Sequence, residues 1–239
     1  MMLLDVAGLK KSFGSIVVAD DLDLAVAPGE AVGIIGPNGA GKTSLFNLIS
    51  GELPQDAGRV RFDGRDLAGL SPQARCRIGL GRTRQIPQPF EKLTVFENCL
   101  VGAVYGRRKT EREAAQSCGE ILTSLGLFKR ANTLAGSLTL LERKRLEMAR
   151  ALATEPRLLL LDEIAGGLTE GECLELVGTI NDIRRSGVAI LWIEHVVHAL
   201  LAVIDRLVVL NFGRKIAEGV PKDVMRMAEV RQIYIGIEA

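Results

Sequence analysis

The 239-residue sequence predicts an α/β fold built on a largely parallel sheet. Short runs rich in leucine and β-branched residues alternate with segments of helical periodicity, a pattern typical of strand–helix–strand units. These strand signals stop between about residues 86 and 154 and then return. We therefore predict one domain, in which an all-helical subdomain at 86–154 is inserted into an α/β core formed by residues 1–85 and 155–239.

The expected elements follow a simple order along the chain. Residues 31–36 (AVGIIG) predict a buried strand, a glycine-rich loop follows, and a helix begins at residue 42 (KTSLFNLIS). Residues 60–64 (VRFDG) predict a strand closed by a turn. Helices are expected within the insertion at 94–106, 110–127 and 142–153. Strands return at 157–162 (RLLLLD), 188–194 (VAILWIE), 206–211 (RLVVLN) and 215–219 (KIAEG).

Composition narrows the class of protein. The chain is 47% hydrophobic and 25% charged, which is typical of a globular protein, and its 30 basic and 29 acidic residues argue against a nucleic-acid partner. Four widely spaced cysteines without a CxxC pair, and only two histidines, disfavour a zinc site and suit a reducing, cytosolic setting. The apolar stretch 187–210 is interrupted by charges, so we expect strand, helix and strand there, and a chain soluble by itself.

Residues 36–43 (GPNGAGKT) match the phosphate-loop pattern GxxxxGK followed by serine or threonine. Glycines allow the backbone N–H groups to wrap phosphates, and the following helix points its positive end at them. Lys42 is expected to reach the β- and γ-phosphates, and the Thr43 hydroxyl is expected to hold Mg²⁺. The pattern lies between a predicted strand and a predicted helix, as this motif requires.

Residues 157–163 (RLLLLDE) predict a strand buried on both faces that ends in two carboxylates. Its carboxyl end would bring Asp162 and Glu163 to the rim of the sheet. Asp162 suits Mg²⁺, and Glu163 suits a base that orients water. Together with the phosphate loop this indicates a nucleotide triphosphatase, and the absence of an NKxD-type guanine motif disfavours a GTPase.

Three further residues complete an ordered set. Phe13 precedes the phosphate loop, Gln85 precedes the helical insertion, and His195 ends a predicted buried strand. The order of all these parts resembles the ATP-binding subunit of ABC transporters over essentially the whole chain. The resemblance implies a P-loop NTPase core of the ABC type and an enzyme that hydrolyses ATP with Mg²⁺ to drive transport across a membrane.

The resemblance also implies roles for individual residues. Glu163, Gln85 and His195 would be catalytic, and Mg²⁺ would be held by Thr43, Gln85 and Asp162. Phe13 would stack on adenine. The remaining residues expected to bind ATP are Gly36, Pro37, Asn38, Gly39, Ala40, Gly41, Lys42, Thr43, Ser44 and, from a neighbouring subunit, Thr139.

The family's signature LSGGQ falls on residues 138–142 (LTLLE) and is altered. Leu140 and Leu141 replace both glycines, and Glu142 puts a carboxylate where a neutral glutamine would face the triphosphate held by a partner subunit. Ile164 and Thr169 also depart from a usual proline and aspartate. Either a different ATPase subunit supplies a better signature in a heterodimer, or the signature is tolerant and a homodimer works.

Three stretches look most like importers of branched-chain or other hydrophobic amino acids: GRTRQ (81–85), LTVFENCLVGA (93–103) and EVRQIYIGIEA (229–239). The implied partners are a membrane permease contacting the chain near Gln85–Asn98, a second ATPase subunit and an extracytoplasmic substrate-binding protein. The expected location is the cytoplasmic face of the membrane. A lipid or lipopolysaccharide exporter, a DNA-repair or ribosome-associated ATPase, and a weakly hydrolysing regulatory subunit are the alternatives.

Overall fold

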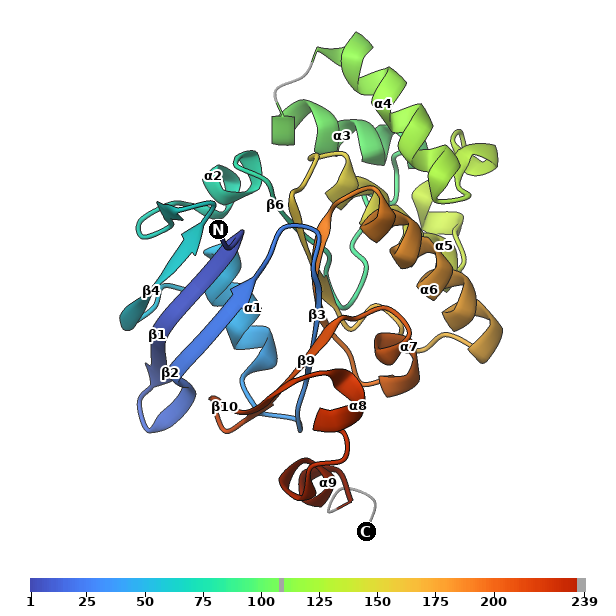
Figure 1. Ribbon diagram of the computed structural model, residues 1–239. Helices are drawn as coiled ribbons and strands as arrows, with labels where there is room; N and C mark the ends of the chain where they lie inside the picture. Colours follow the sequence, from blue (N-terminus) through green and yellow to red (C-terminus); the bar gives the residue numbers. More distant parts are fainter. Residues whose placement is uncertain (108–109, 236–239) are drawn as a thin grey trace.

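The computed structural model describes residues 1–107 and 110–235 and is centred on a six-stranded sheet (Figure 1). Five of its strands are parallel, and the edge strand β10 is antiparallel to its neighbour. This confirms the predicted α/β class and the largely parallel sheet. In spatial order the strands are β10 (Arg214–Gly219), β9 (Arg206–Asn211), β3 (Ala31–Ile35), β8 (Ala189–Ile193), β7 (Leu158–Asp162) and β6 (Leu80–Arg82).

Both faces of the sheet are covered at its centre, which explains why β3, β7, β8 and β9 appear in the sequence as apolar runs. Along β7, Leu158 and Leu160 pack into one hydrophobic core, and Leu159 and Leu161 into the other. All four side chains are fully buried. Burial of each leucine contributes roughly 1.5–3 kcal/mol, so the sheet holds its strand ends in fixed positions.

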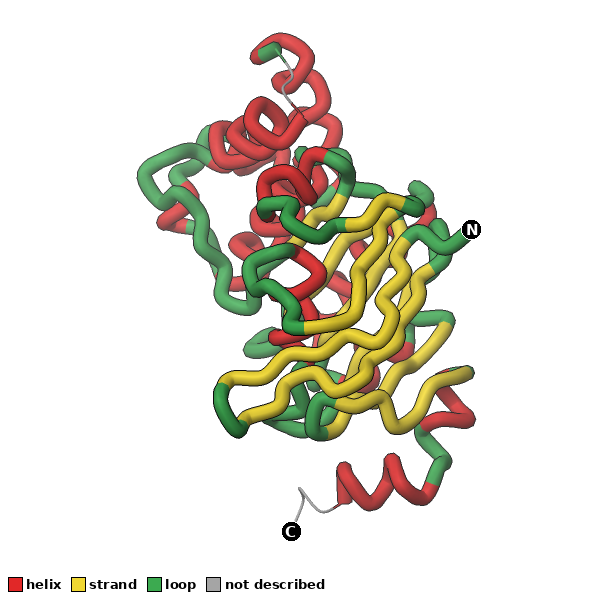
Figure 2. The backbone as a smooth tube through the Cα atoms, turned by 90° about the vertical axis from the view of Figure 1, so that its left-hand side faces the viewer, coloured by secondary structure: helices red, strands yellow, loops and turns green. Residues whose placement is uncertain are grey.

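A second, four-stranded antiparallel sheet packs beside the first, and α1 (Lys42–Ser50) contributes to the core between them (Figures 1 and 2). Its order is β2 (Ile16–Val26), β1 (Leu4–Phe13), β4 (Ala57–Phe62) and β5 (Arg65–Asp66). Only β4 was expected from the sequence. The β1–β2 hairpin matters for the site because it carries Phe13 towards the phosphate loop.

The three helices expected within the insertion are confirmed as α3 (Val95–Arg107), α4 (Glu111–Ser124) and α5 (Leu140–Leu152). They lie together in the upper right of Figure 1, with α5 below α4, and share one core with the sheet face that they cover. Two 3₁₀ turns, Phe128–Arg130 and Ala135–Ser137, connect α4 to α5. The division into a core of residues 1–85 and 155–239 and a helical subdomain at 86–154 remains our proposal.

Besides α1, five further helices of the described residues lie outside the insertion. The expected helix within 195–205 is confirmed as α7, whereas the other four were not predicted. Their bounds are α2 (Pro72–Arg77), α6 (Glu170–Arg185), α7 (Val197–Leu201), α8 (Pro221–Val224) and α9 (Ala228–Ile235).

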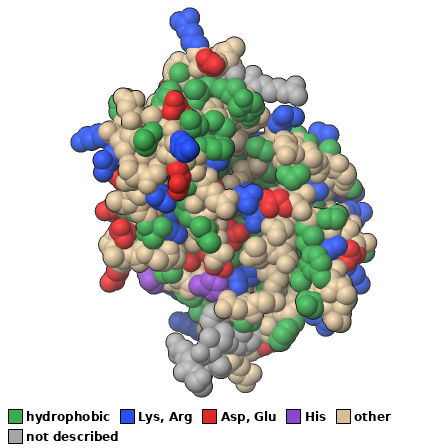
Figure 3. Space-filling view, turned by 180° about the vertical axis from the view of Figure 1, so that it is seen from behind, with side chains coloured by type: hydrophobic (Ala, Val, Ile, Leu, Met, Phe, Trp, Pro, Cys, Tyr) green, Lys and Arg blue, Asp and Glu red, His purple; other side chains and the backbone are tan. Residues whose placement is uncertain are grey.

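Within the described ranges, no helix combines the length and the apolar character needed to cross a bilayer. On the face shown in Figure 3, acidic and basic side chains are interspersed, in keeping with a net charge of +1.

Candidate active site

Four loops meet at one edge of the six-stranded sheet because the carboxyl ends of its parallel strands point the same way. The phosphate loop follows β3, Gln85 follows β6, Glu163 follows β7, and His195 follows β8. The order of strands in the sheet therefore collects residues that are more than 150 positions apart in the sequence.

The phosphate loop, residues 36–43, needs glycine for two separate physical reasons. Gly41 has φ 98°, and a Cβ there would lie 2.2 Å from the Val18 carbonyl oxygen. Gly36 has an ordinary φ, yet a Cβ there would lie 2.3 Å from the Leu210 carbonyl oxygen. The loop closes on a pocket of about 310 Å³ that is lined by Ile16, Val18, residues 38–44 and Glu163.

Lys42 points its ammonium group into the phosphate loop. Its Nζ donates to the carbonyl oxygens of Gly36 and Pro37, at 2.7 and 3.0 Å. Burial lowers the pKa of Lys42, and the carboxylates of Glu163 and Asp162 act in the opposite direction. The buried ammonium group of Lys42 thus lies close to the carboxylates of Glu163 and Asp162. Such a cluster of buried, interacting charged groups is typical of functional sites.

The three residues predicted to be catalytic converge on one carboxylate. Gln85 Nε2 donates to Oε2 of Glu163, and His195 Nε2 lies 2.8 Å from Oε1 of Glu163. Glu163 adopts φ 46°, a left-handed conformation that costs free energy in a residue other than glycine. Its backbone N–H donates to the Ile193 carbonyl oxygen at 2.9 Å. The carboxylate is thus held between the ends of β6 and β8.

Asp162 suits a divalent cation because only half of its carboxylate has a partner. The side chain is buried, and Oδ2 accepts a hydrogen bond from Arg82 Nη2 at 3.0 Å. Oδ1 is also buried, without a hydrogen-bond partner in the part of the chain described. Burial raises the pKa of Asp162, and the Arg82 guanidinium lowers it. A buried, unpartnered carboxylate oxygen beside a phosphate loop fits Mg²⁺, which uses one or two carboxylates together with substrate phosphates.

Phe13 and Thr139 lie outside the pocket at the phosphate loop. Phe13 is 52% exposed and pairs across the β1–β2 hairpin with Ile16, which lines that pocket. The Nζ of Lys11 lies 5.3 Å from the centre of its ring. Thr139 is the N-cap of α5, and its hydroxyl accepts a hydrogen bond from the Glu142 backbone N–H at 3.3 Å.

The altered signature begins a regular helix. The Glu142 carboxylate accepts from the Thr139 backbone N–H at 2.9 Å and from Arg130 Nε at 2.9 Å, which completes a capping box and an ion pair. Leu141 is buried, whereas Leu140 is 42% exposed. Glu142 therefore has a structural role within this chain, and Thr139 lies exposed at the start of the helix.

Sequence reasoning missed two charged residues near the site, the partly buried Arg82 and the buried Glu194. Glu194 accepts hydrogen bonds from the backbone N–H groups of two loops: from Ala165 at 2.9 Å, from His195 at 2.9 Å and from Val196 at 3.2 Å. Its side chain thus joins the loop after Glu163 to the loop that carries His195. The sequence signal was the carboxylate that ends the apolar run AILWIE, directly before His195.

Comparison with known proteins identifies relatives that match nearly the whole chain. Residues 19–166 match the ABC transporter family. The chain is 34% identical to the high-affinity branched-chain amino acid transport ATP-binding protein BraF of Pseudomonas aeruginosa, over 98% of each chain. It is also 34% identical to the lipopolysaccharide export system ATP-binding protein LptB of Haemophilus influenzae, over 99% of this chain and 98% of that protein.

Solved structures give the same result for the fold. The ADP conformation of MJ1267, an ATP-binding cassette of an ABC transporter, superposes with a TM-score of 0.91 at 33% identity, over 99% of each chain. The structure of cbiO1 from Clostridium perfringens, part of the ABC transporter complex cbiONQ, superposes with a TM-score of 0.86 at 25% identity, over 98% of this chain and 95% of that one.

Proposed function

The chain belongs to the ABC transporter family of ATP-binding subunits, whose members couple ATP hydrolysis to transport, and we propose that it powers uptake of branched-chain or other hydrophobic amino acids. The observation that carries the ATPase assignment is the convergence of Gln85 and His195 on Glu163 at the mouth of the phosphate loop. The substrate class is supported by the likeness to BraF. Of the three stretches that indicate this class, the last ends in residues 236–239, which lie outside the described residues.

We propose that Glu163 orients the water that attacks the γ-phosphate. Gln85 and His195 hold the carboxylate of Glu163 in one position. A water molecule can therefore bind to this carboxylate without a change in the side chain's orientation. Lys42 would exchange its bonds to two loop carbonyls for bonds to the β- and γ-phosphates. Mg²⁺, held by Thr43, Asp162 and Gln85, would neutralise charge that develops on the phosphates.

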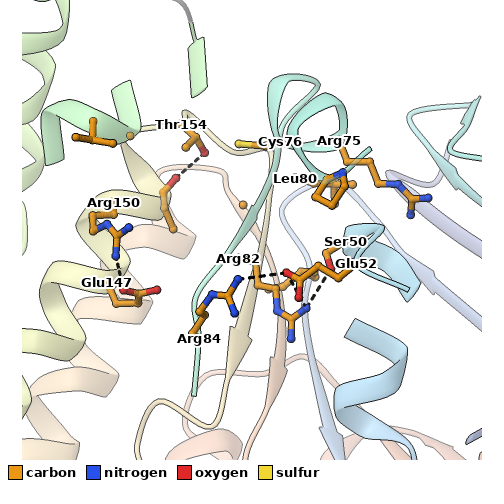
Figure 4. A pocket seen from close by; sticks show the side chains of 16 residues that line it. Ser50, Glu52, Arg75, Cys76, Leu80, Arg82, Arg84, Glu147, Arg150 and Thr154 are labelled. Atoms are coloured by element: carbon orange, nitrogen blue, oxygen red, sulfur yellow. Dashed lines mark hydrogen bonds and ion pairs between the residues drawn. The ribbon is translucent and has the colours of Figure 1, made fainter. Parts of the chain in front are cut away.

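The proposed permease contact is the segment from Gln85 to Asn98 together with the groove beside it. The groove has a volume of about 290 Å³ and lies between α2 and β6 on one side and α3 and α5 on the other (Figure 4). Asn98 is fully buried and exchanges hydrogen bonds with the backbone of Phe90, which fixes the shape of the segment. Arg150 on α5 stacks on the Phe90 ring, with 4.9 Å between its guanidinium carbon and the ring centre.

Transport tests the proposed substrate class. The chain would be purified with the permease encoded beside its gene and reconstituted into vesicles, with its substrate-binding protein added on the side opposite to the ATPase. We expect ATP-dependent movement of labelled leucine that stops when the binding protein is omitted. Release of lipopolysaccharide or lipid from the membrane, with no movement of leucine, would replace amino-acid import by the exporter alternative.

Replacing Phe13 by alanine is expected to weaken ATP binding roughly 5- to 150-fold, because stacking of a base on an aromatic ring contributes about 1–3 kcal/mol. The fold is expected to tolerate the change, since the ring is half exposed. Titration of the chain with ATP by calorimetry measures the effect, with Phe13→Tyr as the matched control that keeps the ring. Equal affinities of the alanine and tyrosine variants would remove Phe13 from the adenine site.

A regulatory subunit with weak hydrolysis is the second candidate. The altered signature, residues 138–142, favours it because two glycines are absent where a close backbone approach to the partner's phosphate is expected. The intact set of Glu163, Gln85 and His195 favours hydrolysis by this subunit's own site. The oligomeric state of the Glu163→Gln variant in the presence of ATP tests the signature directly.

A further inference from the structure

Arg82, the last residue of β6, joins Asp162 to the helix that follows the phosphate loop. Its Nη2 donates to Oδ2 of Asp162 at 3.0 Å. Its Nη1 donates to Asn47 Oδ1 at 2.7 Å and to Ser50 Oγ at 3.0 Å, both on α1. The guanidinium carbon also lies 5.7 Å from the centre of the Phe46 ring. One side chain therefore bridges β7 and α1.

Arg82 also has an acidic neighbour, Glu52. Glu52 Oε1 lies 3.5 Å from Arg82 Nη1 and 3.9 Å from Nη2 of Arg84 (Figure 4). The Arg82 side chain is only 14% exposed, whereas that of Arg84 is 58% exposed. Nη1 of Arg82 is directed at acceptors on Asn47, Ser50 and Glu52, and Nη2 is directed at Asp162, whereas Nε is buried without a hydrogen-bond partner among the described residues.

When one oxygen of a carboxylate is fixed by a hydrogen bond, the other oxygen points in a defined direction. Arg82 engages Oδ2 of Asp162, and Oδ1 is left buried without a partner among the described residues. Groups that orient a metal ligand from outside the coordination sphere typically change metal affinity 10–100-fold when they are removed. We propose that Arg82 is a positioning residue that turns the Asp162 carboxylate so that Oδ1 faces Mg²⁺ at the nucleotide. This inference rests on the proposed metal role of Asp162.

The test measures how much Mg²⁺ strengthens the binding of ATPγS, a slowly hydrolysed ATP analogue. Affinity is determined by calorimetry with Mg²⁺ and with a chelator in its place, and the ratio of the two is the Mg²⁺ gain. We expect Arg82→Gln to lower this gain about tenfold, while the affinity in chelator changes less than twofold. Arg82→Lys keeps one donor and the charge, so its gain is expected to fall about threefold.

Two control variants separate the possible failures. Arg84→Gln changes a neighbouring arginine that shares Glu52 but forms no ion pair with Asp162 within the described part of the chain, and we expect its gain to stay within about twofold of the parent. Asp162→Asn is expected to lower the gain at least as much as Arg82→Gln. A parent-like gain in Asp162→Asn would overturn the metal role itself.

A clear loss in Asp162→Asn together with a parent-like gain in Arg82→Gln would overturn the proposal for Arg82 alone. An equal fall in both affinities of Arg82→Gln would also overturn it, because that would be the effect of a general structural defect. If Arg82→Gln does not fold, Arg82→Lys decides the matter, since it retains a cation at this partly buried position. An unchanged gain in the folded lysine variant would then exclude the positioning role.

Discussion

Replacing Glu163 by glutamine is expected to lower the rate of ATP hydrolysis about 10²–10³-fold while ATP remains bound, since a positioned general base contributes typically 10²–10⁴-fold. Glutamine has nearly the same size, and its amide can still accept from Gln85 and donate towards His195. Loss of a negative charge beside the triphosphate would also favour binding. Phosphate release and ATP titration measure the two effects separately.

Glu170→Gln is the matched control, because Glu170 is an exposed carboxylate in the first turn of α6 and lies outside the phosphate-loop pocket. We expect its turnover to stay within about twofold of the parent. Turnover of Glu163→Gln within tenfold of the parent would remove Glu163 as the base.

The Glu163→Gln variant also tests the altered signature. If its signature can bind the phosphate held by a partner subunit, a subunit that binds ATP without hydrolysing it accumulates as a closed dimer. Size-exclusion chromatography with ATP and Mg²⁺ detects this. A dimer would show that residues 138–142 work without their glycines and that a homodimer is sufficient. ATP binding by a chain that stays monomeric would support a different partner subunit with an intact signature.

Four strands of the six-stranded sheet were predictable because they are buried on both faces, and the edge strand β10 was also expected, whereas the short strand β6 was not predicted. Because β3, β7, β8 and β9 are continuous apolar runs, these segments are expected in the middle of an α/β core. Since parallel strands end at one edge, the meeting of Glu163 and His195 followed from the same reasoning. The hydrogen-bond partner of each carboxylate oxygen of Glu163 could not be predicted in this way.

The antiparallel sheet was harder to predict because β1 and β2 carry charged residues and irregular pairing. The register of the β1–β2 pair shifts at three places, so apolar and polar residues do not alternate cleanly along either strand. Lys10 and Lys11 interrupt the second half of β1. A sequence pattern with a period of two is lost wherever an extra residue enters the ladder.

Partly buried charged residues near the site escaped prediction for a different reason. In the segment GRTRQ, nothing in the sequence distinguishes Arg82, which is 14% exposed, from Arg84, which is 58% exposed. The distinction arises only in the fold, because β6 ends at Arg82 and places it against α1, which supplies acceptors, whereas Arg84 lies two residues beyond the end of the strand. Glu142 was interpreted as a poor neighbour for a triphosphate, whereas the pattern TxxE at 139–142 is that of the capping box it forms.

Replacing Lys42 by methionine is expected to weaken ATP binding by about 10²-fold or more. Each hydrogen bond to a charged group contributes about 1.5–3 kcal/mol, and Lys42 is expected to make two such bonds, to the β- and γ-phosphates. The variant would also leave Asp162 and Glu163 without the buried cation that now balances them, so the pocket would repel a triphosphate. Binding is measured by calorimetry with and without Mg²⁺.

The reason for methionine is that it preserves the length and apolar stem of the side chain while it removes the ammonium group. The carbonyl oxygens of Gly36 and Pro37 lose a donor, yet the loop borders a water-accessible pocket, so we expect the melting temperature without nucleotide to fall by no more than about 5 °C. Lys129→Met, at an exposed position in the helical insertion, serves as the control for loss of one positive charge. ATP affinity of Lys42→Met equal to that of Lys129→Met would mean that the phosphates are held elsewhere, and the nucleotide site would have to be relocated from the end of β3.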